Sequence, residues 1–266
     1  MRFSEGLMKR VQKILIWVGI IAYMFVVLGL VNNKMDKIPC EVVSVSVKDS
    51  SENHFIESHD IYSMVIFYDK NILGMPFNMI NTEEIEDLLG KYPFVRNAQV
   101  FKGSNGKINI SVTQREPVVR VLNYNDQGYY IDDDGFVMPV SEYYTARVPV
   151  ANGWNLGGIN PGFNLEDYKG NSKYKTLQDV YLLSRFIHHD KFWKAQIEQI
   201  YVTQSGEFEL IPRVGAHSII FGDLNKFHEK FRKLYALYVY GLNNEGWNTY
   251  SKINLKYKGQ VVCTKR

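Results

Sequence analysis

The feature that most constrains this chain is an uninterrupted apolar run, ILIWVGIIAYMFVVLGLV, from Ile14 to Val31. The run contains no charged residue and no Asn, Gln, Ser, Thr or Pro. As a helix its 18 residues would extend roughly 27 Å, which is close to the thickness of the hydrocarbon core of a bilayer. The run therefore predicts a transmembrane helix at 14–31.

The flanks of this run predict that the helix is kept as an anchor and is not removed as a signal peptide. A signal peptide has a shorter apolar core and a cleavage site made of small residues, which the segment Asn32–Lys37 lacks. Basic residues before the run outnumber those just after it, which by the positive-inside tendency places the N-terminus in the cytoplasm. We expect a cytoplasmic tail at 1–13, a linker at 32–40 and the rest of the chain across the membrane.

Composition limits what the rest of the chain can be. The 266 residues leave room for two modest domains, and an aromatic content of 14% supplies bulky side chains for their cores. The net charge of +3, with scattered Lys and Arg, argues against a nucleic-acid-binding protein. The two cysteines, Cys40 and Cys263, exclude a disulfide framework. We expect unpaired thiols, and one disulfide in an oxidising compartment stays open.

The residues 41–116 are predicted to form a small α+β domain. Alternating valines indicate its first strand, and Asn105-Gly106 between two alternating runs is the strongest short signal for a β-hairpin. Ser58 is a candidate cap for the first helix, and Asn81 or Thr82 for the second. The expected order is strand, helix, helix, strand, strand, with the bounds 41–47, 58–68, 82–90, 95–101 and 107–113.

The residues 117–266 are predicted to form a mixed, β-rich domain with two helices. An amphipathic pattern indicates a helix at 176–191, and a second helix is expected to be capped by Asp223 and to end at Gly241. Short alternating or apolar runs between turns predict the strands. Their expected bounds are 118–122, 127–131, 135–139, 148–150, 197–203, 207–211, 216–221, 250–257 and 260–263.

No motif in the sequence predicts catalysis, a metal site or a bound cofactor. Ser104 and Lys107 have the S-x-x-K spacing of penicillin-recognising enzymes, but they flank the predicted hairpin turn and no companion motif is present. The contiguous acids Asp132–Asp134 before a glycine are typical of a turn and not of a calcium loop. The neighbours His188 and His189 would point to different faces of a helix, which disfavours a shared metal.

The terminal strand is the one positive functional signal that the residues supply. Ile253, Leu255 and Tyr257 alternate with a polar row that consists of Lys252, Asn254, Lys256 and Lys258. Such a row can protect an edge strand against aggregation. It can equally belong to a strand that pairs with a strand of a partner protein. The pattern leaves both interpretations open.

Three stretches of the chain resemble a known family. Tyr92–Phe101 with Ile108–Val119 (YPFVRNAQVF, INISVTQREPVV) is similar to the pattern P-x-V-x-x-A-x-V followed by l-x-i-x-V-x-E-R-x-P-V. Tyr130–Val137 (YIDDDGFV) is similar to x-l-D-x-x-G-x-v. Ile220–Asp223, a Lys-rich helix and Ile253–Tyr257 are similar to the ending v-x-L-G, K-x-x-x-L, i-D-L-R-Y. Over nearly the whole chain these patterns resemble the FtsQ/DivIB family of bacterial cell-division proteins.

The resemblance implies an α+β protein with a single N-terminal transmembrane helix, a POTRA-like domain and a β-rich domain. It implies a non-enzymatic divisome scaffold in the inner membrane at the division septum, with the bulk of the chain in the periplasm. It further implies that the terminal strands bind small coiled-coil division proteins of the FtsB/FtsL type and help to recruit septal cell-wall synthesis. The implied partner-binding residues are Ile253, Leu255, Lys256, Tyr257, Gly259 and Val261.

The chain departs from the family pattern at several positions. Gln114 stands where an acid is usual, Phe221 replaces Leu, and Asn254 and Lys256 replace Asp and Arg. Lys keeps the positive charge but loses the bidentate fork of Arg. Two other hypotheses stay open. One is a membrane-anchored envelope enzyme acting on peptidoglycan, and the other is a different POTRA-bearing envelope assembly or transport factor.

Overall fold

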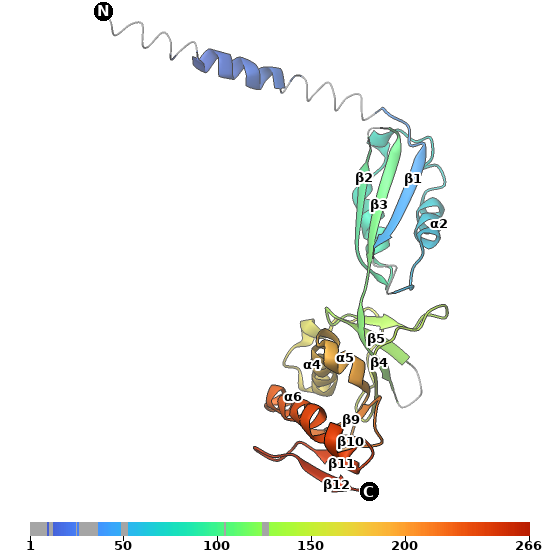
Figure 1. Ribbon diagram of the computed structural model, residues 1–266. Helices are drawn as coiled ribbons and strands as arrows, with labels where there is room; N and C mark the ends of the chain where they lie inside the picture. The colour runs from blue at the N-terminus through green and yellow to red at the C-terminus, as the bar shows by residue number, and fades with distance from the viewer. Residues whose placement is uncertain are drawn as a thin grey trace, which may run out of the picture. The chain divides into compact units, whose positions relative to one another are not determined.

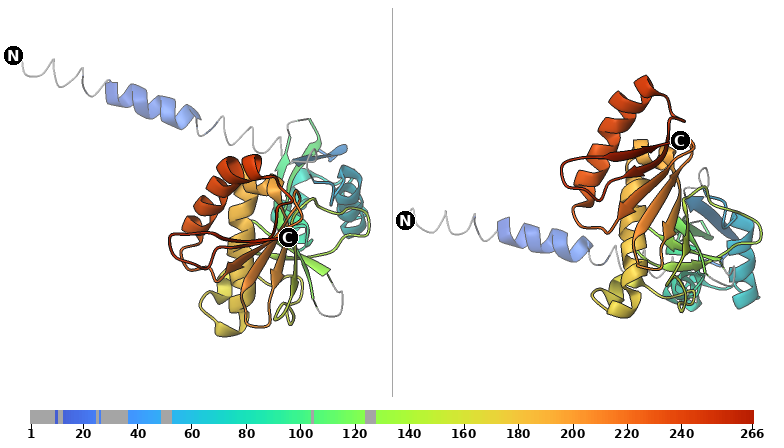
Figure 2. Two further views of the ribbon diagram at one scale, coloured as in Figure 1. Left: turned by 60° about the horizontal axis from the view of Figure 1, so that its bottom comes forward. Right: turned by 90° about the horizontal axis from the view of Figure 1, so that it is seen from below.

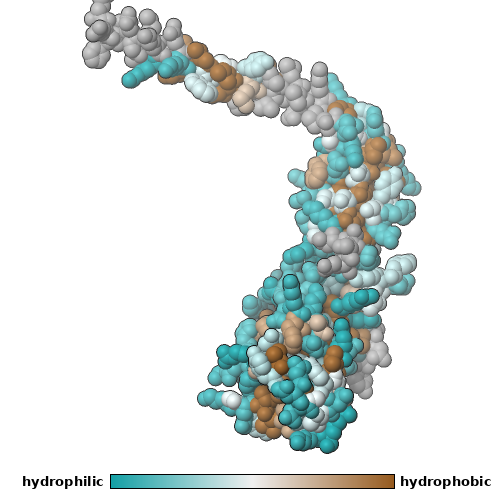
Figure 3. Space-filling model, in the orientation of Figure 1, coloured by the Kyte–Doolittle hydropathy of each residue, from teal (hydrophilic) through white to brown (hydrophobic). Residues whose placement is uncertain are grey.

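The computed structural model describes residues 10, 13–24, 26, 37–48, 53–103, 105–123 and 128–266. Residues 13–24 are helical, and their apolar side chains, such as Ile14 and Trp17, are exposed along the helix (Figure 3). Within the described ranges, no helix is both long enough and apolar enough to cross a membrane. Most of the predicted tail, residues 25 and 27–31 of the predicted span, and residues 32–36 of the predicted linker lie outside these ranges.

The chain divides into two compact units that together give the predicted α+β fold. Unit 1 consists of Met1–Ser50 and Ile56–Thr113, and unit 2 consists of Ser51–Phe55 and Gln114–Arg266. The short segment before Ile56 therefore belongs with the later part of the chain. The polar contacts of Gln114, described below, explain this assignment.

Unit 1 is built on a three-stranded sheet with the order β1-β3-β2 (Figure 1). β1 pairs with β3 in parallel, and Val43 lies opposite Ile108. The predicted order of strand, helix, helix, strand, strand is confirmed, with a short 3₁₀ turn between the helices. The elements are β1 (Val42–Lys48), α2 (Ser58–Tyr68), η1 (Phe77–Met79), α3 (Thr82–Gly90), β2 (Val95–Lys102) and β3 (Lys107–Gln114).

Local sequence explains most of these elements. The alternation in β3 buries Ile108, Ile110 and Val112 to 1% exposure or less, and each such side chain contributes roughly 1.5–3 kcal/mol on burial. The side chain of Asn81 accepts hydrogen bonds from the backbone N–H groups of Glu83 and Glu84, so α3 has the expected cap. The expected cap of α2 was wrong by one residue. Glu57 is the cap, since its N–H donates to Asp60 and Ser58 is already helical.

Unit 2 contains a nine-stranded sheet with the order β12-β11-β10-β9-β8-β7-β4-β5-β6. The pairs β4–β7, β7–β8 and β10–β11 are parallel, and the other pairs are antiparallel. The strands are β4 (Pro117–Leu122), β5 (Gly128–Asp132), β6 (Val137–Pro139), β7 (Val150–Gly153), β8 (Ile197–Val202), β9 (Phe208–Pro212), β10 (Ser218–Gly222), β11 (Tyr250–Asn254) and β12 (Val262–Lys265).

The longer helices of unit 2 lie on one side of this sheet (Figure 2). Trp193, Phe231 and Tyr238 from these helices share one buried cluster with the strands, which include Ile200, Leu210 and Ile253. The helical segments are η2 (Leu165–Tyr168), η3 (Ser172–Tyr174), α4 (Lys175–His189), α5 (Lys191–Gln196), α6 (Phe227–Ala236), the π-helical turn η4 (Leu237–Leu242) and α7 (Asn243–Glu245).

Several expected bounds in unit 2 were wrong. The strand expected at 148–150 is β7 at Val150–Gly153, because its pairing with β4 and β8 sets its position. A separate helix, α5, follows α4, since the side chain of Asp190 caps it. The strand expected at 250–257 ends at Asn254, and the one expected at 260–263 is β12 at Val262–Lys265.

The helix expected to be capped by Asp223 begins later, at Phe227. The carboxylate of Asp223 accepts a 2.8 Å hydrogen bond from Lys230 Nζ, and the backbone oxygen of Asp223 accepts a second one at 2.7 Å. The cap position is instead taken by Lys226 in a left-handed conformation, with φ of 52°. The helical stretch also continues beyond Gly241, through η4 into α7.

Candidate functional site at the terminal strands

The last two strands close one end of the nine-stranded sheet (Figure 2). β11 lies between β10 and β12, with Ile219 opposite Ile253 on one side and Cys263 opposite Ile253 on the other. β12 is therefore the edge strand, and within the described part of the chain no strand pairs with its outer side. An edge of this kind presents unpaired backbone groups to a strand of another chain.

The backbone groups that face outward from β12 can be assigned from one hydrogen bond. The N–H of Arg266 donates to the carbonyl of Thr249 at 3.1 Å, so the backbone groups of Arg266 point toward the β11 side. Backbone groups alternate in direction along an antiparallel strand, and the irregularity in this pairing lies in β11 at Tyr250–Lys252. The outward-facing groups of β12 are therefore those of Cys263 and Lys265.

The inner face of the terminal strands is fixed in the core of unit 2. Ile253 and Leu255 are 0% and 1% exposed, and they belong to the same buried cluster as Phe231 and Leu234 of α6. Val261 and Cys263 are partly buried against this cluster. Packing against the core therefore holds the edge strand in place. Because the edge is already ordered, little of its conformational entropy would be lost when another strand pairs with it.

One lysine holds the loop that joins β11 to β12. Lys233 Nζ, on α6, donates to the backbone oxygens of Tyr257 at 2.8 Å, Gln260 at 3.2 Å and Leu255 at 3.3 Å. An ammonium group has three donors, so these carbonyls satisfy all of them. The loop therefore depends on a charge-assisted contact with a helix as well as on its own turn.

A second lysine crosses the sheet next to this loop. Lys256 Nζ lies 2.6 Å from Glu207 Oε1, and the hydrogen bond and charge of Glu207 raise the pKa of Lys256. The side chain passes over Gly222, where an added Cβ would lie 2.9 Å from Lys256 Cγ. Gly222 also has φ of +75°, so glycine suits this position for two reasons.

A polar network lies at the other end of unit 2, around the acidic turn. Arg115 donates to Asp132 at 2.8 Å, and His188 Nε2 lies 2.7 Å from Glu116 Oε1. Burial raises the pKa of Asp132, and the hydrogen bond from Arg115 only partly offsets this. The acids form the turn of the β5–β6 hairpin, as expected, because Asp132 also accepts the backbone N–H groups of Asp134 and Phe136.

Asp133, the next acid, contacts α4. Its carboxylate lies 2.7 Å from His189 Nε2 and 3.2 Å from Arg185 Nε. Burial would raise the pKa of Asp133, but the contacts with His189 and Arg185 outweigh burial and lower it. Among the described residues, no group of three or more His, Cys, Asp or Glu side chains could hold a metal ion. Of the pair expected from the S-x-x-K spacing, Lys107 starts β3 and Ser104 lies outside the described residues.

Gln114 shows why the chain departs from the family pattern at this position. Its side chain is buried, its Oε1 accepts from the N–H of Phe55 at 3.0 Å, and its Nε2 donates to the oxygen of Asn53 at 3.0 Å. An ionised carboxylate can only accept, so an acid would leave the oxygen of Asn53 without this donor. The amide thereby joins segment 53–55 to unit 2.

Sequence comparison places this architecture among known proteins. Residues 38–113 match the POTRA-like domain, and residues 116–264, more than half of the chain, match the model described as FtsQ/DivIB, C-terminal related. The chain belongs to the FtsQ/DivIB family. It is 27% identical over 182 residues to the cell division protein FtsQ of Rhodothermus marinus, covering 67% of this chain and 63% of that protein. The chain thus spans less than two thirds of that FtsQ.

The six partner-binding residues that the FtsQ/DivIB resemblance implied have different environments. Ile253 and Leu255 are buried, and Val261 is partly buried, so these three support the edge. Lys256 and Tyr257 lie in the loop after β11, and Tyr257 is 50% exposed. Gly259 forms the turn with φ of +72°. Their role in binding stays a prediction.

Sequence reasoning expected a strand at 260–263 but attributed the edge position to the strand at 250–257, whereas the edge strand is β12. Val262, Thr264 and Lys265 are exposed on β12, and none was among the expected contact residues. The β-branched residues on either side of Cys263 could have indicated this strand. The alternation of the lysine-rich row at 252–258 was stronger and drew the prediction to the preceding strand. Both cysteines are free thiols, as expected, and burial raises the pKa of each.

Proposed function

We propose that this protein is a non-enzymatic scaffold of the bacterial divisome. In this proposal the outer edge of β12 pairs with a strand of a small coiled-coil division protein of the FtsB/FtsL type. The single observation that carries the proposal is the unpaired, core-supported edge of β12 within the region that matches the FtsQ/DivIB family. Recruitment of septal cell-wall synthesis would follow from holding that partner at the septum.

The chemistry of the described residues supports binding over catalysis. The titratable residues around the acidic turn are used in ion pairs that join β5, α4 and the start of β4. Such pairs fix elements to one another and leave the carboxylates of Asp132 and Asp133 engaged. We therefore propose that the protein acts through its surfaces.

The proposal includes membrane anchoring through the apolar run at 14–31. It places the N-terminus in the cytoplasm and the domains expected at 41–116 and 117–266 in the periplasm. Apolar side chains such as Ile14, Leu15 and Trp17 are more than 60% exposed on the helix at 13–24, which supports a lipid environment for them. Retention of the full chain in the pellet after alkaline extraction of membranes would support the anchor, and release into the supernatant would contradict it.

A single substitution at the edge tests strand pairing. Lys265→Pro removes an outward-facing N–H while the inward-facing groups of β12 stay available to β11. We expect the full chain carrying Lys265→Pro to lose capture of FtsB and FtsL, because the partner's strand loses a backbone bond and meets the proline ring. Pull-down from detergent-solubilised membranes measures this.

The matched control is Lys265→Ala, which removes the same side chain and keeps the N–H. It should capture the partners as the unchanged chain does. Equal capture by Lys265→Pro and Lys265→Ala would contradict strand pairing at β12. Equal loss by both would assign the contact to the lysine side chain and would also contradict it.

A further inference from the structure

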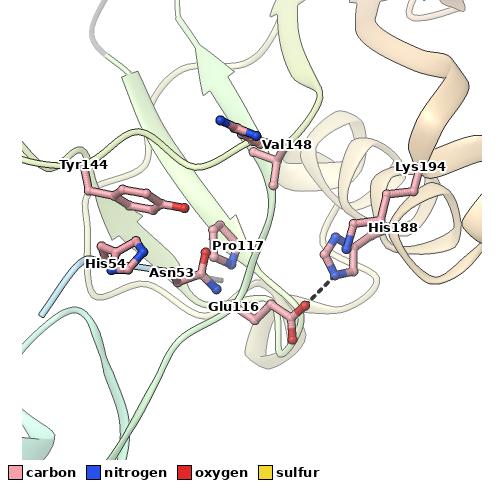
Figure 4. A pocket seen from close by; sticks show the side chains of 9 residues that line it. Asn53, His54, Glu116, Pro117, Tyr144, Val148, His188 and Lys194 are labelled. Atoms are coloured by element: carbon pink, nitrogen blue, oxygen red, sulfur yellow. Dashed lines mark hydrogen bonds and ion pairs between the residues drawn. The ribbon is translucent and has the colours of Figure 1, made fainter. Parts of the chain in front are cut away.

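A cavity of about 450 Å³ lies in unit 2 (Figure 4). None of its described lining residues belongs to β11 or β12. Its volume is within the range of about 300–1,000 Å³ that is usual for small-molecule sites. The start of β4, the loop before β7, the end of α4 and helix α5 contribute to its wall, as does segment 53–55. The lining residues are Asn53, His54, Glu116, Pro117, Tyr144, Arg147, Val148, His188 and Lys194.

One arginine and one lysine in this cavity make no side-chain contact with a charged or polar partner within the described part of the chain. Arg147 and Lys194 line the cavity and are exposed, and neither makes an ion pair or a side-chain hydrogen bond with another described residue. The acid in the cavity, Glu116, is already held by His188 at 2.7 Å. The cavity therefore contains two positive charges that no carboxylate of the described residues neutralises, beside one carboxylate that His188 already engages.

The histidine adds an acceptor to these charges. A carboxylate can only accept, so we assign the proton of the Glu116–His188 contact to His188 Nε2. His188 Nδ1 is then an acceptor in the neutral ring, and it is buried without a hydrogen-bond partner among the described residues. The His188 side chain is 7% exposed, so an unmet acceptor there is costly unless a ligand or water supplies a donor.

Asn53 and His54 add polar groups to the remaining wall, and the rest of it is apolar and held in place. Pro117 and Val148 contribute aliphatic surface, and the ring of Tyr144 packs edge-on against Phe55 at a centroid distance of 4.8 Å. Phe55 is in turn fixed by its backbone bond to Gln114. The cavity thus combines two cations, acceptors at Glu116 and His188, and a firm apolar wall.

We propose that this cavity binds the carboxyl terminus of a short peptide. Arg147 and Lys194 hold the terminal carboxylate, for which the planar guanidinium is well suited. Glu116 and His188 Nδ1 accept from N–H groups of the peptide, and the apolar wall contacts a small side chain. A polyphosphate is disfavoured because the carboxylate of Glu116 would repel it, whereas a peptide offers donors to the same group.

Calorimetric titration of the full chain in detergent micelles tests this site with the probe Ala-Ala-Ala. We expect binding of the tripeptide, and at least about tenfold weaker binding of its C-terminal amide, since amidation removes the charge. Arg147→Gln and Lys194→Gln should each weaken binding of the acid by about tenfold. Both side chains are exposed, so thermal unfolding should be unchanged.

Two exposed residues outside the cavity supply matched controls. Lys191 lies on α5 with Lys194, and Arg213 follows β9. Lys191→Gln and Arg213→Gln should bind the tripeptide as the unchanged chain does. Equal binding of acid and amide, loss of binding in the controls, or no binding at millimolar tripeptide would overturn the proposal. Inorganic phosphate binding in place of the tripeptide would overturn it in favour of a simple anion site.

Discussion

The guanidinium of Arg115 donates a 2.8 Å hydrogen bond to Asp132, whose side chain is 1% exposed. The guanidinium also lies 3.6 Å from the ring centroid of Phe136. The pair joins the segment that enters β4 to the β5–β6 turn. Because both groups are largely withdrawn from water, losing one partner would leave a buried charge uncompensated.

We predict that Arg115→Met lowers the free energy of unfolding of unit 2 by about 3–5 kcal/mol, as for other broken buried pairs. Urea titration of the full chain, followed by tryptophan fluorescence, measures the change. The control is Lys169→Met, whose pair with Glu166 is 81% and 42% exposed and should be worth about 0–1 kcal/mol. A similar small change for both variants would contradict the structural role of Arg115.

Because His217 is buried, we expect the folded protein to lose stability in mild acid. Its ring is 3% exposed, Nε2 lies 2.9 Å from the Tyr238 hydroxyl, and burial lowers the pKa of His217 below 6.5. The unfolded state therefore binds the proton more readily than the folded state. The contribution of neutral His217 to the free energy of unfolding is present above the pKa of the unfolded state, about 6.5, and is lost as pH falls through the lower pKa of the folded state.

His217→Gln keeps a polar atom near Tyr238 and removes the titration. We expect its melting temperature to change less between pH 7.5 and pH 5.5, both chosen to bracket the unfolded pKa of about 6.5, than that of the unchanged chain. The exposed His228 is the control, and His228→Gln should retain the full pH dependence. The same pH dependence in all three chains would rule out His217 as its source.

The contacts of Lys233 should determine how firmly the β11–β12 loop is held. Lys233→Met keeps the aliphatic stem and removes three hydrogen bonds to the β11–β12 loop. Hydrogen exchange at residues 255–265 should become faster, by a factor that corresponds to about 1–3 kcal/mol, since the donors are charged. The neighbouring exposed Arg232 supplies the control, and Arg232→Met should leave the exchange unchanged. Unaltered protection in Lys233→Met would show that the loop turn alone fixes the edge.

The pair Lys256–Glu207 separates a structural role from a binding role. The side chains are 43% and 36% exposed, so neither Lys256→Met nor Glu207→Gln should measurably change the free energy of unfolding. If Lys256 contacts the partner, Lys256→Met lowers capture of FtsB and FtsL, whereas Glu207→Gln frees the lysine and keeps capture. The same result for both variants would contradict a direct contact by Lys256.

Sequence patterns predicted unit 1 well because its elements are set locally. The alternation of Ile108, Ile110 and Val112 fixes which face of β3 is buried, and Asn81 supplies the cap of α3. These signals need only neighbouring residues. The expected order of elements in unit 1 followed from them without knowledge of the sheet.

The misplaced bounds in unit 2 depend on contacts between distant residues. Nothing in Val150–Gly153 alternates, and β7 exists because β4 and β8 pair with it on both sides. Asp223 has the residue type of a helix cap, but Lys230 engages it. β11 ends at Asn254, because the side chain of Asn254 accepts a 3.0 Å hydrogen bond from the backbone N–H of Lys256. The backbone N–H of Leu255 donates to the oxygen of Ile220 in β10. The edge position of β12 follows from the order of the whole sheet.

The one-sided pairing of β12 also gives the terminal edge a directional response to force. A load applied along the strand would be shared by all the backbone bonds between β11 and β12 at once. A load applied across the sheet would open these bonds one after another, starting at one end. A partner joined to this edge would therefore be held most firmly when tension between the two proteins runs parallel to β12, and the angle of pull would help to decide how long they stay together.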